Sequence, residues 1–447
     1  MTARQLVVRV NDQLVGHLRE ENDLWQFEYS STWVKLPQAF DLAPALSRSQ
    51  GLIVDGATNR PVQWYFDNLL PEEALRTLIA KESGLNADDA FGLLAHFGAE
   101  SAGSLVLRVP GKTTLAKRGL KPLPLKELSK RIANLAKVSL TKDAPKRMSL
   151  AGAQHKMLMT LRDGELFEPL PGTASTHILK PNHPGKDYPA SVMNEYFTMR
   201  LAAALELDAP RVHRMYVPQP VYIVERFDRI VPASGSIDVD TVLRRHVIDT
   251  CQLLNKARTF KYTAAHLDTL KQAIEYCRSK AAARMQLFRW LVFNILVGNG
   301  DSHLKNISFL VDESGINIAP AYDLLSTAAY DTKSLADDKG RWPHTSLALT
   351  LGDAKTFAGV TREHILDAAT TIGLTRTTAT RELDRMLRDA PLAAETLITE
   401  IEASIGREAK ASPDPKVAGR NLAIERRLLS AIKHIVIADM CKRLRPR

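Results

Sequence analysis

The polar run at residues 298–306, Gly-Asn-Gly-Asp-Ser-His-Leu-Lys-Asn, contains the side chains best suited to chemistry. Asp301 is followed five residues later by Asn306, and a second carboxylate, Asp323, comes next in the segment Ala-Tyr-Asp. Phosphoryl transfer needs such a set, because one carboxylate orients the attacking hydroxyl while an asparagine and a second aspartate hold magnesium. The same residue types also favour loops, so a solvated turn is the alternative that this run leaves open.

Two side chains within this run, and a lysine upstream, could neutralise phosphate charge. His303 and Lys305 could face a transferred phosphoryl group. A metal-site role for His303 is disfavoured, because no second histidine or cysteine lies at ligand spacing. Lys180 ends the run Thr-His-Ile-Leu-Lys, where a strand could hold its ammonium beside nucleotide phosphates, although an exposed strand end is the simpler interpretation. Glu195, on the helix predicted next, could pair with Lys180 through a charge-assisted hydrogen bond.

Two further segments could contact a nucleotide. Residues 149–156, Ser-Leu-Ala-Gly-Ala-Gln-His-Lys, have small residues at their centre, as a phosphate-binding backbone requires. They contain one glycine, so a strand-edge turn is the alternative. Residues 224–229, Val-Glu-Arg-Phe-Asp-Arg, follow a predicted strand pair, where a kinase offers backbone groups to adenine and an aromatic ring to its face. A surface ion-pair network is the alternative there.

Composition limits the class of protein. The chain has 447 residues, of which 45% are apolar and 25% charged, enough for two or three domains with substantial cores. Sixty lysines and arginines against 50 acidic residues give a net charge of +10, which suits an anionic partner such as nucleic acid or reflects surface composition alone. Three isolated cysteines indicate neither a disulfide framework nor a zinc site. Without a signal sequence or an apolar stretch that could span a bilayer, we expect a soluble, cytoplasmic protein.

Hydrophobic periodicity predicts an N-terminal α+β domain at residues 1–110. It contains a small antiparallel sheet at 5–36, helices at 72–82 and 88–97, and a strand at 104–109. Residues 111–143 are rich in lysine and proline, and we interpret them as a basic linker that contains one amphipathic helix, at 126–137.

The remaining sequence has the element order of a two-lobed kinase. Residues 144–230 form a β-rich nucleotide-binding lobe, with one helix at 192–205 and strands at 149–161, 176–179, 212–217 and 221–227. Residues 231–447 form a helical catalytic lobe, with helices at 266–281, 283–297, 362–372, 377–387, 392–405 and 418–442. The predicted fold class is therefore α+β: a two-lobed protein-kinase-like fold with an N-terminal α+β subdomain and a largely helical C-terminal lobe.

These motifs resemble the HipA family, the serine/threonine kinase toxins of bacterial type II toxin–antitoxin modules. The resemblance covers most of the chain and rests on residues 66–71 (FDNLLP), 149–156 (SLAGAQHK), 176–180 (THILK), 194–196 (NEY), 224–229 (VERFDR), 249–253 (DTCQL), 300–306 (GDSHLKN) and 321–324 (AYDL).

The resemblance implies ATP and Mg²⁺ as cofactors and assigns roles to particular residues. Asp301 would be the catalytic base, assisted by His303 and Lys305, and Asn306 and Asp323 would bind Mg²⁺. Ser149 would be autophosphorylated. The nucleotide-binding set would be Ala151, Gly152, Ala153, Gln154, His155, Lys156, Lys180 with Glu195, Glu225, Arg226, Phe227, His303, Leu304, Lys305, Asn306, Tyr322, Asp323, Leu324 and Leu325.

The resemblance also implies partners. The substrate would be a protein, in this family an aminoacyl-tRNA synthetase such as glutamate–tRNA ligase, whose inactivation inhibits translation and causes growth arrest and persistence. A helix-turn-helix antitoxin of the HipB type would bind the kinase, and the complex would bind operator DNA and repress its own operon. The alternatives are a catalytically idle partner of antitoxin and DNA, and a small-molecule kinase with the same lobes.

Overall fold

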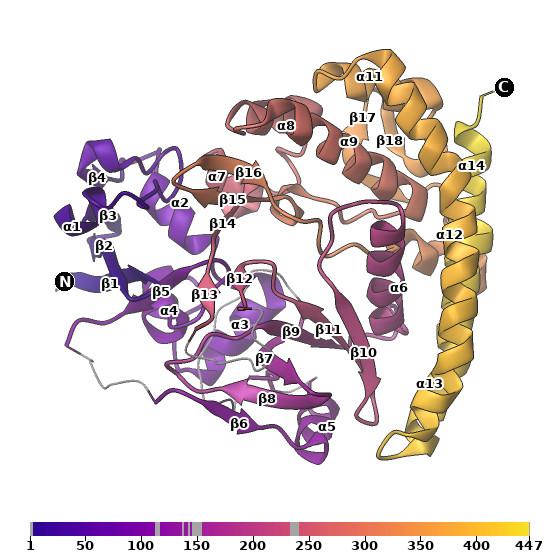
Figure 1. Ribbon diagram of the computed structural model, residues 1–447, viewed down its shortest axis with the longest axis horizontal. Coiled ribbons are helices and arrows are strands. Elements are labelled where there is room, and N and C mark those ends of the chain that lie inside the picture. The colour runs from indigo at the N-terminus through magenta and orange to yellow at the C-terminus, as the bar shows by residue number, and fades with distance from the viewer. Residues whose placement is uncertain are drawn as a thin grey trace. The chain divides into compact units, whose positions relative to one another are not determined.

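The computed structural model describes residues 3–111, 117–135, 138–141, 144, 154–232 and 241–446 (Figure 1). These residues fall into two compact units. The first unit contains the chain up to Leu179, Glu225–Phe260 and Ser308–Ala319. The second contains Lys180–Val224, Lys261–Ile307 and the chain from Pro320 onward. Both units are therefore assembled from segments that alternate along the sequence, and the four-part division of the sequence stays a prediction.

The first unit begins with a five-stranded antiparallel sheet of order β4-β3-β2-β1-β5. Its strands are β1 (Arg4–Val10), β2 (Gln13–Glu21), β3 (Leu24–Tyr29), β4 (Leu52–Val54) and β5 (Leu105–Arg108). Two-residue turns at Asn11-Asp12 and Asn22-Asp23 have positive φ at both positions, which matches the right-handed twist of the flanking strands. The antiparallel sheet predicted for residues 5–36 is thus present, except that Ser31–Val34 forms a short helix, α1.

Helices cover the buried side of this sheet. Helix α2 (Pro61–Asp67) contacts β3 and α4 (Ala90–Phe97) contacts β5, while α3 (Glu73–Glu82) lies between them in the sequence. Alternate residues of the strands, such as Leu6 and Val8, are fully buried, because successive side chains of a strand point to opposite faces. The N-terminal α+β architecture predicted from periodicity is confirmed.

The rest of the first unit is mostly β-structure. The elements are β6 (Leu120–Pro122), α5 (Leu125–Ala133), β7 (Met157–Arg162), β8 (Glu165–Pro169), β9 (His177–Pro181, whose last two residues belong to the second unit), β12 (Arg229–Ile230), β13 (Leu243–Arg244), β14 (His246–Asp249), α7 (Thr250–Leu253), β15 (Ser308–Asp312) and β16 (Gly315–Ile318). Strand β7 pairs with β8 and β9, and β15 pairs with β14 and β16, all antiparallel. The predicted strand at 149–161 is described only from residue 154 onward, where β7 begins at Met157.

A cluster of buried charges lies inside the first unit. The Glu100 carboxylate accepts hydrogen bonds from Arg229, at 2.9 Å, and from Arg244, while Arg226 donates to Asp228 at 2.6 and 2.8 Å. Burial alone would raise the pKa of Asp228, but Arg226 and Arg229 outweigh it and lower that pKa to about 2. The ion-pair network anticipated for residues 224–229 is therefore present but buried rather than at the surface.

The second unit is mainly helical. Its elements are α6 (Ser191–Ala204), β10 (Val212–Tyr216), β11 (Pro220–Glu225, whose last residue belongs to the first unit), α8 (Leu267–Glu275), α9 (Lys280–Val297), α10 (Lys333–Ala336), β17 (Ser346–Leu351), β18 (Ala354–Thr356), α11 (Arg362–Thr371), α12 (Arg376–Lys410), α13 (Pro415–Ala431), a π-helical segment (Ile432–Ile437) and α14 (Ala438–Leu444). Helix α9 is buried on most sides and contacts α8, α11, α12 and α14. It therefore fixes the position of the polar run that follows it.

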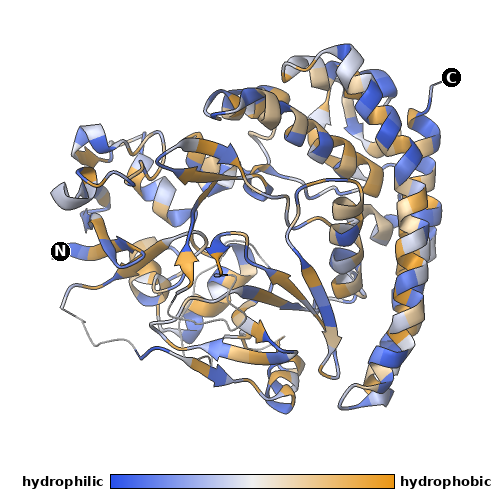
Figure 2. Cartoon of the chain, viewed as in Figure 1, coloured by the Kyte–Doolittle hydropathy of each residue, from blue (hydrophilic) through white to orange (hydrophobic). Residues whose placement is uncertain are grey.

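The two helices predicted at 377–387 and 392–405 are a single helix, so the predicted break was wrong. Helix α12 continues through Pro391 and lies beside α13 at the right of Figure 1. An internal proline costs about 3 kcal/mol, because it removes a backbone hydrogen bond. The helix buries Leu387, Leu397 and Ile401, each worth roughly 1.5–3 kcal/mol, which outweighs that cost. Figure 2 shows the hydrophobic and hydrophilic residues interspersed along α12, as an amphipathic helix requires.

Smaller differences concern helix ends. Helix α8 ends at Glu275 rather than at residue 281, and the helix predicted at 418–442 is divided by the π-helical segment.

Within the described part of the chain, no helix combines the length and apolar character that crossing a membrane would require.

His246 is a buried histidine in the first unit, at the start of β14. Its Nε2–H donates to the Leu42 carbonyl at 2.9 Å, so Nδ1 accepts from the Ser104 hydroxyl at 3.0 Å, and Phe40 stacks on the ring. Burial lowers the pKa of His246 to about 4, since an imidazolium would lose its hydration there.

We therefore predict that His246 destabilises the fold as the medium becomes acidic. Above about pH 6.5 both folded and unfolded states hold a neutral ring, and stability is unaffected. As pH falls from about 6.5 to 4 only the unfolded state takes the proton, which costs up to roughly 3 kcal/mol of unfolding free energy. In chemical denaturation across pH 4–7, His246→Gln should lose stability less steeply than the wild type. The exposed His434→Gln variant is the control, and parallel pH profiles for wild type and His246→Gln would contradict the prediction.

Candidate functional site

A buried lysine is held between two carboxylates in the second unit. Lys180 Nζ lies 2.7 Å from Glu195 Oε1, on α6, and 2.5 Å from Asp323 Oδ1, in the segment after β16. The Lys180 and Glu195 side chains are 8% and 2% exposed, whereas Asp323 is about one-third exposed. The pairing of Lys180 with Glu195 that the sequence suggested is therefore present, and Asp323 joins it.

Electrostatics keeps this lysine charged. Burial alone would lower the pKa of Lys180, but Asp323 and Glu195 outweigh burial and raise that pKa well above its ordinary value. Asp323 has a positive φ of 56°, a conformation that is uncommon outside glycine and for which aspartate is among the better-suited residues. Its carboxylate is thus set by the backbone as well as by Lys180.

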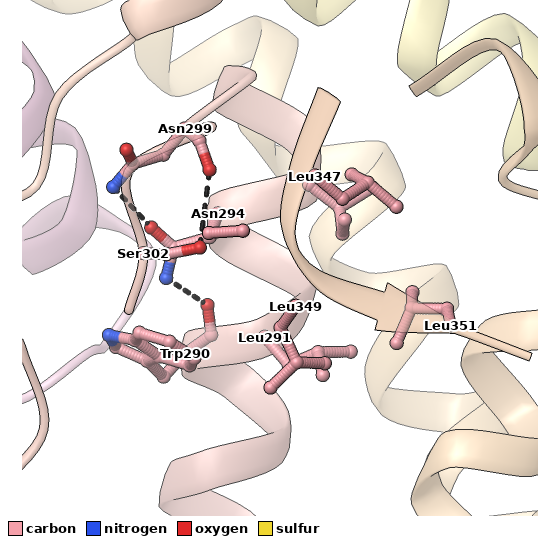
Figure 3. Close-up of a pocket in the computed structure, with 10 residues that line it drawn as sticks. Trp290, Leu291, Asn294, Asn299, Ser302, Leu347, Leu349 and Leu351 are labelled. Carbon is pink, nitrogen blue, oxygen red and sulfur yellow. Dashed lines mark hydrogen bonds between the residues drawn. The ribbon is translucent and has the colours of Figure 1, made fainter. Parts of the chain in front are cut away.

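The loop that contains Asp301 is held by a chain of side-chain amides from the end of α9. Asn294 Nδ2 donates to the Trp290 carbonyl at 2.7 Å, and Asn299 Nδ2 donates to Asn294 Oδ1 at 2.7 Å (Figure 3). The Asn299 Oδ1 atom then accepts from the Asp301 amide at 3.0 Å, and Ser302 Oγ donates to the Asn299 carbonyl at 3.2 Å. These bonds connect the buried helix directly to the backbone of Asp301.

Helix α9 ends where Gly298 adopts a left-handed conformation, with φ 67°. A Cβ at this position would lie 2.8 Å from Val436 and 2.9 Å from Ala328, so both the backbone and the packing require glycine. The next glycine, Gly300, donates its amide to Thr327 Oγ1 at 2.7 Å. The loop is therefore fixed on both sides of Asn299.

A small cavity lies behind the loop (Figure 3). Its volume is about 10 Å³, enough for roughly one water molecule. It is lined by Trp290, Leu291, Asn294, Ile295, Asn299, Ser302, Leu347, Ala348, Leu349 and Leu351. It is a packing gap between α9 and β17 and too small for a substrate.

Asp301 itself receives a hydrogen bond from a side chain outside the motif. The Tyr262 hydroxyl donates to Asp301 Oδ1 at 2.5 Å, and the Tyr262 ring meets the His303 ring edge-on at 4.9 Å. Burial raises the pKa of Asp301, and nearby Asp323 adds to this, whereas His303 and the Tyr262 hydrogen bond oppose it. The pKa of Asp301 therefore depends both on groups of the loop and on the carboxylate that binds Lys180.

Two more predicted residues complete this group. Asn306 Nδ2 donates to the Asp301 carbonyl at 2.8 Å, and the Tyr322 hydroxyl donates to the Lys305 carbonyl at 2.6 Å. Because the amide nitrogen of Asn306 is used in this way, its oxygen is the atom left to accept a ligand. That oxygen and the Asp323 carboxylate are the hard donors that Mg²⁺ prefers, so the residues fit the predicted metal.

The remaining predicted residues belong to other parts of the chain. Gln154, His155, Lys156, Glu225, Arg226 and Phe227 are in the first unit. The Arg226 side chain is taken up by the buried charge cluster, and its backbone amide and carbonyl are bonded to Thr176 and Arg229. Phe227 packs on Val247 and Leu310. In the second unit Leu304 and Leu324 are buried and Leu325 is partly exposed. Ser149, Ala151, Gly152 and Ala153 lie outside the described residues.

Comparison of the chain with protein-family models gives two matches, and one of them includes all the predicted site residues. The family model for the HipA-like C-terminal domain matches residues 148–394, and that for the HipA N-terminal domain matches residues 6–108. The chain belongs to the HipA family. Its relatives include a putative kinase, Y4mE, of Sinorhizobium fredii, which is 36% identical over 343 residues, covering 74% of this chain and 79% of the relative.

Two comparisons with HipA of Shewanella oneidensis extend this result. The serine/threonine-protein kinase toxin HipA of that organism is 30% identical over 353 residues, covering 74% of this chain and 77% of the toxin. A solved complex of S. oneidensis HipA, HipB and operator DNA contains a chain that matches with a TM-score of 0.73 and 25% identity, covering 98% of this chain and 99% of that one. The present chain is thus a member of a serine/threonine kinase toxin family with the HipA fold.

The sequence did not indicate several residues that shape the HipA site. Tyr262 lies in no motif and is 39 residues from Asp301, while Asn294 and Thr327 read as ordinary helix and loop residues. The polarity of Asn294 within an otherwise apolar helix, residues 290–297, is the one signal that could have identified it. A buried amide in such a position must find a hydrogen-bond partner.

We predict that Lys180→Met destabilises the second unit by about 3–5 kcal/mol, because the buried Glu195 carboxylate loses its counter-ion. The double variant Lys180→Met/Glu195→Met should recover much of this loss, since no buried charge is left unpaired. Thermal and urea denaturation would measure both effects, with the exposed Lys186→Met as the control. Equal stability of Lys180→Met and wild type would show that the ion pair is energetically unimportant.

Proposed function

We propose that this HipA-family chain is an ATP-dependent serine/threonine protein kinase that transfers the γ-phosphate to a hydroxyl of a protein. The observation that carries the proposal is the Lys180 ammonium between Glu195 and Asp323, in the same unit as the Asp301 loop. A buried ammonium on a strand, fixed by a helix glutamate and adjacent to a metal-binding aspartate, is the arrangement that kinases use for phosphates.

The residues would divide the reaction between them. Lys180 would bind nucleotide phosphates, and its ion pair with Glu195 would hold the ammonium in place before the nucleotide arrives. Asp301 would orient the acceptor hydroxyl and take its proton, a role for which a raised pKa brings the carboxylate closer to the pH of the cell. His303 and Lys305 would offset charge on the phosphoryl group. Bound Mg²⁺, held by Asn306 and Asp323, would supply charge neutralisation at the phosphates.

Other contacts are proposed for the first unit. The segment 151–156 would cradle phosphates, and the backbone of Glu225–Phe227 would meet the adenine. Tyr322, Leu324, Leu325 and Leu304 are further residues proposed to contact the nucleotide.

The partners are proposed on the same basis. The S. oneidensis complex contains HipB and operator DNA, which supports a helix-turn-helix antitoxin and, through it, operator DNA as partners here. The net charge of +10 would favour phosphate contacts in such a complex, and repression of the operon would follow. The protein substrate would be an aminoacyl-tRNA synthetase such as glutamate–tRNA ligase in the cytoplasm, whose loss of activity would stop translation and lead to growth arrest and persistence.

We predict that Asp301→Asn lowers phosphoryl transfer by about 10²–10⁴-fold while Mg·ATP affinity changes little, because the base acts on the acceptor hydroxyl and not on the nucleotide. Asp323→Ala should instead weaken Mg²⁺-dependent ATP binding, since a metal ligand is lost. Calorimetry and [γ-³²P]ATP labelling of a cell extract separate the two effects, and the exposed Asp338→Asn serves as the control. Substantial residual transfer by Asp301→Asn would refute the proposed role of the base.

We also predict that Mg·ATP leads to phosphorylation of Ser149 and self-inactivation. A phosphate adds roughly −1.5 to −2 charge, which would repel the nucleotide from the adjacent segment. Peptide mapping after incubation, followed by re-assay, should show phosphate on Ser149 and reduced activity in wild type. Ser149→Ala should stay active under the same treatment, and Asp301→Asn should remain unlabelled. A fully active enzyme phosphorylated at Ser149 would exclude this mode of regulation.

A further inference from the structure

Tyr262 contacts the Asp301 loop at two points, and the residue before it adds a third contact. Its hydroxyl donates to Asp301 Oδ1 at 2.5 Å, and its ring meets the His303 ring edge-on at 4.9 Å, with an interplanar angle of 81°. The preceding residue, Lys261, accepts a hydrogen bond from the Leu304 amide through its carbonyl at 3.1 Å. All these residues belong to the second unit, so the contacts are internal to it.

The exposure of Tyr262 is unusual for a residue with a structural role alone. Tyr262 is 44% exposed, although its hydroxyl is bonded to the carboxylate of Asp301, which is only partly buried. A tyrosine that anchors a core normally buries its ring and leaves its hydroxyl at the periphery. Tyr262 instead stays substantially exposed while its hydroxyl is bonded to Asp301.

The hydroxyl of Tyr262 makes the bond that an acceptor would have to make. A general base must lie within hydrogen-bond reach, about 2.6–3.2 Å, of the hydroxyl from which it takes the proton. The phenol O–H already donates to Asp301 at 2.5 Å, slightly shorter than this range, and it belongs to the same class of donor as serine, threonine or water.

On the basis of the proposed function, we propose that Tyr262 occupies the acceptor-hydroxyl position on Asp301 in the absence of substrate and is displaced by the protein acceptor. Tyr262 then acts as a specificity-determining residue for the transfer reaction. A protein acceptor with its own binding contacts can replace the phenol, whereas water, which has none, competes poorly. Tyr262 thereby restricts transfer of the γ-phosphate to water.

The cation near the ring fits this role. Lys261 Nζ lies 5.2 Å from the centre of the Tyr262 ring. Its positive charge also attracts the Asp301 carboxylate and so lowers the pKa of Asp301. The ring therefore has a favourable contact that does not depend on the hydrogen bond to Asp301. Removing the hydroxyl alone leaves both ring contacts in place, which makes Tyr262→Phe a conservative test.

The test compares the full-length wild type with Tyr262→Phe and with Tyr276→Phe, a control tyrosine of the same unit that is 47% exposed. Two reactions are measured with Mg·ATP: phosphate release without a protein acceptor, and transfer to dephosphorylated casein over a range of casein concentrations. In Tyr262→Phe we expect phosphate release to rise by roughly 10- to 100-fold, in line with the loss of one hydrogen bond to a charged group. The KM for casein should fall, the KM for ATP should stay within about twofold, and Tyr276→Phe should match wild type.

Other outcomes overturn the inference. Unchanged phosphate release and unchanged casein KM in Tyr262→Phe would show that the phenol does not compete for Asp301. An equal fall in kcat with water and with casein would show that Tyr262 orients Asp301 instead of occupying the acceptor position. Phosphate found on Tyr262 of the wild type would show that the phenol is itself an acceptor. If neither the wild type nor any variant turned over ATP, the proposed kinase function would be wrong, and this inference with it. In each of the other outcomes the wild type is an active kinase, so the two failures can be distinguished.

Discussion

The site depends on one physical constraint, which is that a buried ammonium cannot remain charged without carboxylates against it. Lys180 satisfies the constraint with Glu195 and Asp323, from two segments more than 120 residues apart. Removing a charge from water costs several kcal/mol, and only good ion-pair geometry recovers that cost. Strand β9, helix α6 and the segment of Asp323 are therefore held in one arrangement by charge as well as by apolar packing.

Much of this arrangement could be predicted from the sequence. Strict alternation in residues 5–36 and helical spacing in the later segments reflect which faces must be buried, and that information is local. The polar run at 298–306 was conspicuous because it interrupts an apolar segment. The pairing of Lys180 with Glu195 followed from the order strand, lysine, helix, which positions a helix glutamate near the end of the preceding strand.

What could not be predicted depends on contacts between distant segments. Tyr262 reaches Asp301 only after the chain has folded, and nothing in its own neighbourhood marks it. Pro391 is a local signal for a helix end, but the helix persists because tertiary packing along α12 outweighs that signal. Arg226 belongs to a segment for which a surface ion-pair network was the alternative interpretation, yet it pairs with Glu100 and Asp228 in the interior. In each case the local preference is weaker than the energy of a long-range contact.

Because β14 pairs with β15, the first unit can be completed only after the Asp301 loop has been synthesised. In the sequence, β14 precedes and β15 follows the segment that contributes α8, α9 and the Asp301 loop to the second unit. A nascent chain that has emerged only as far as β14 still lacks β15, the strand with which β14 pairs, and the first unit stays incomplete until β15 follows. By then the ribosome has already released the whole Asp301 loop. Asp323, which belongs to the stretch after β16, leaves the ribosome only after the last strand of the first unit, so the charge that completes the Lys180 cluster arrives last among its members.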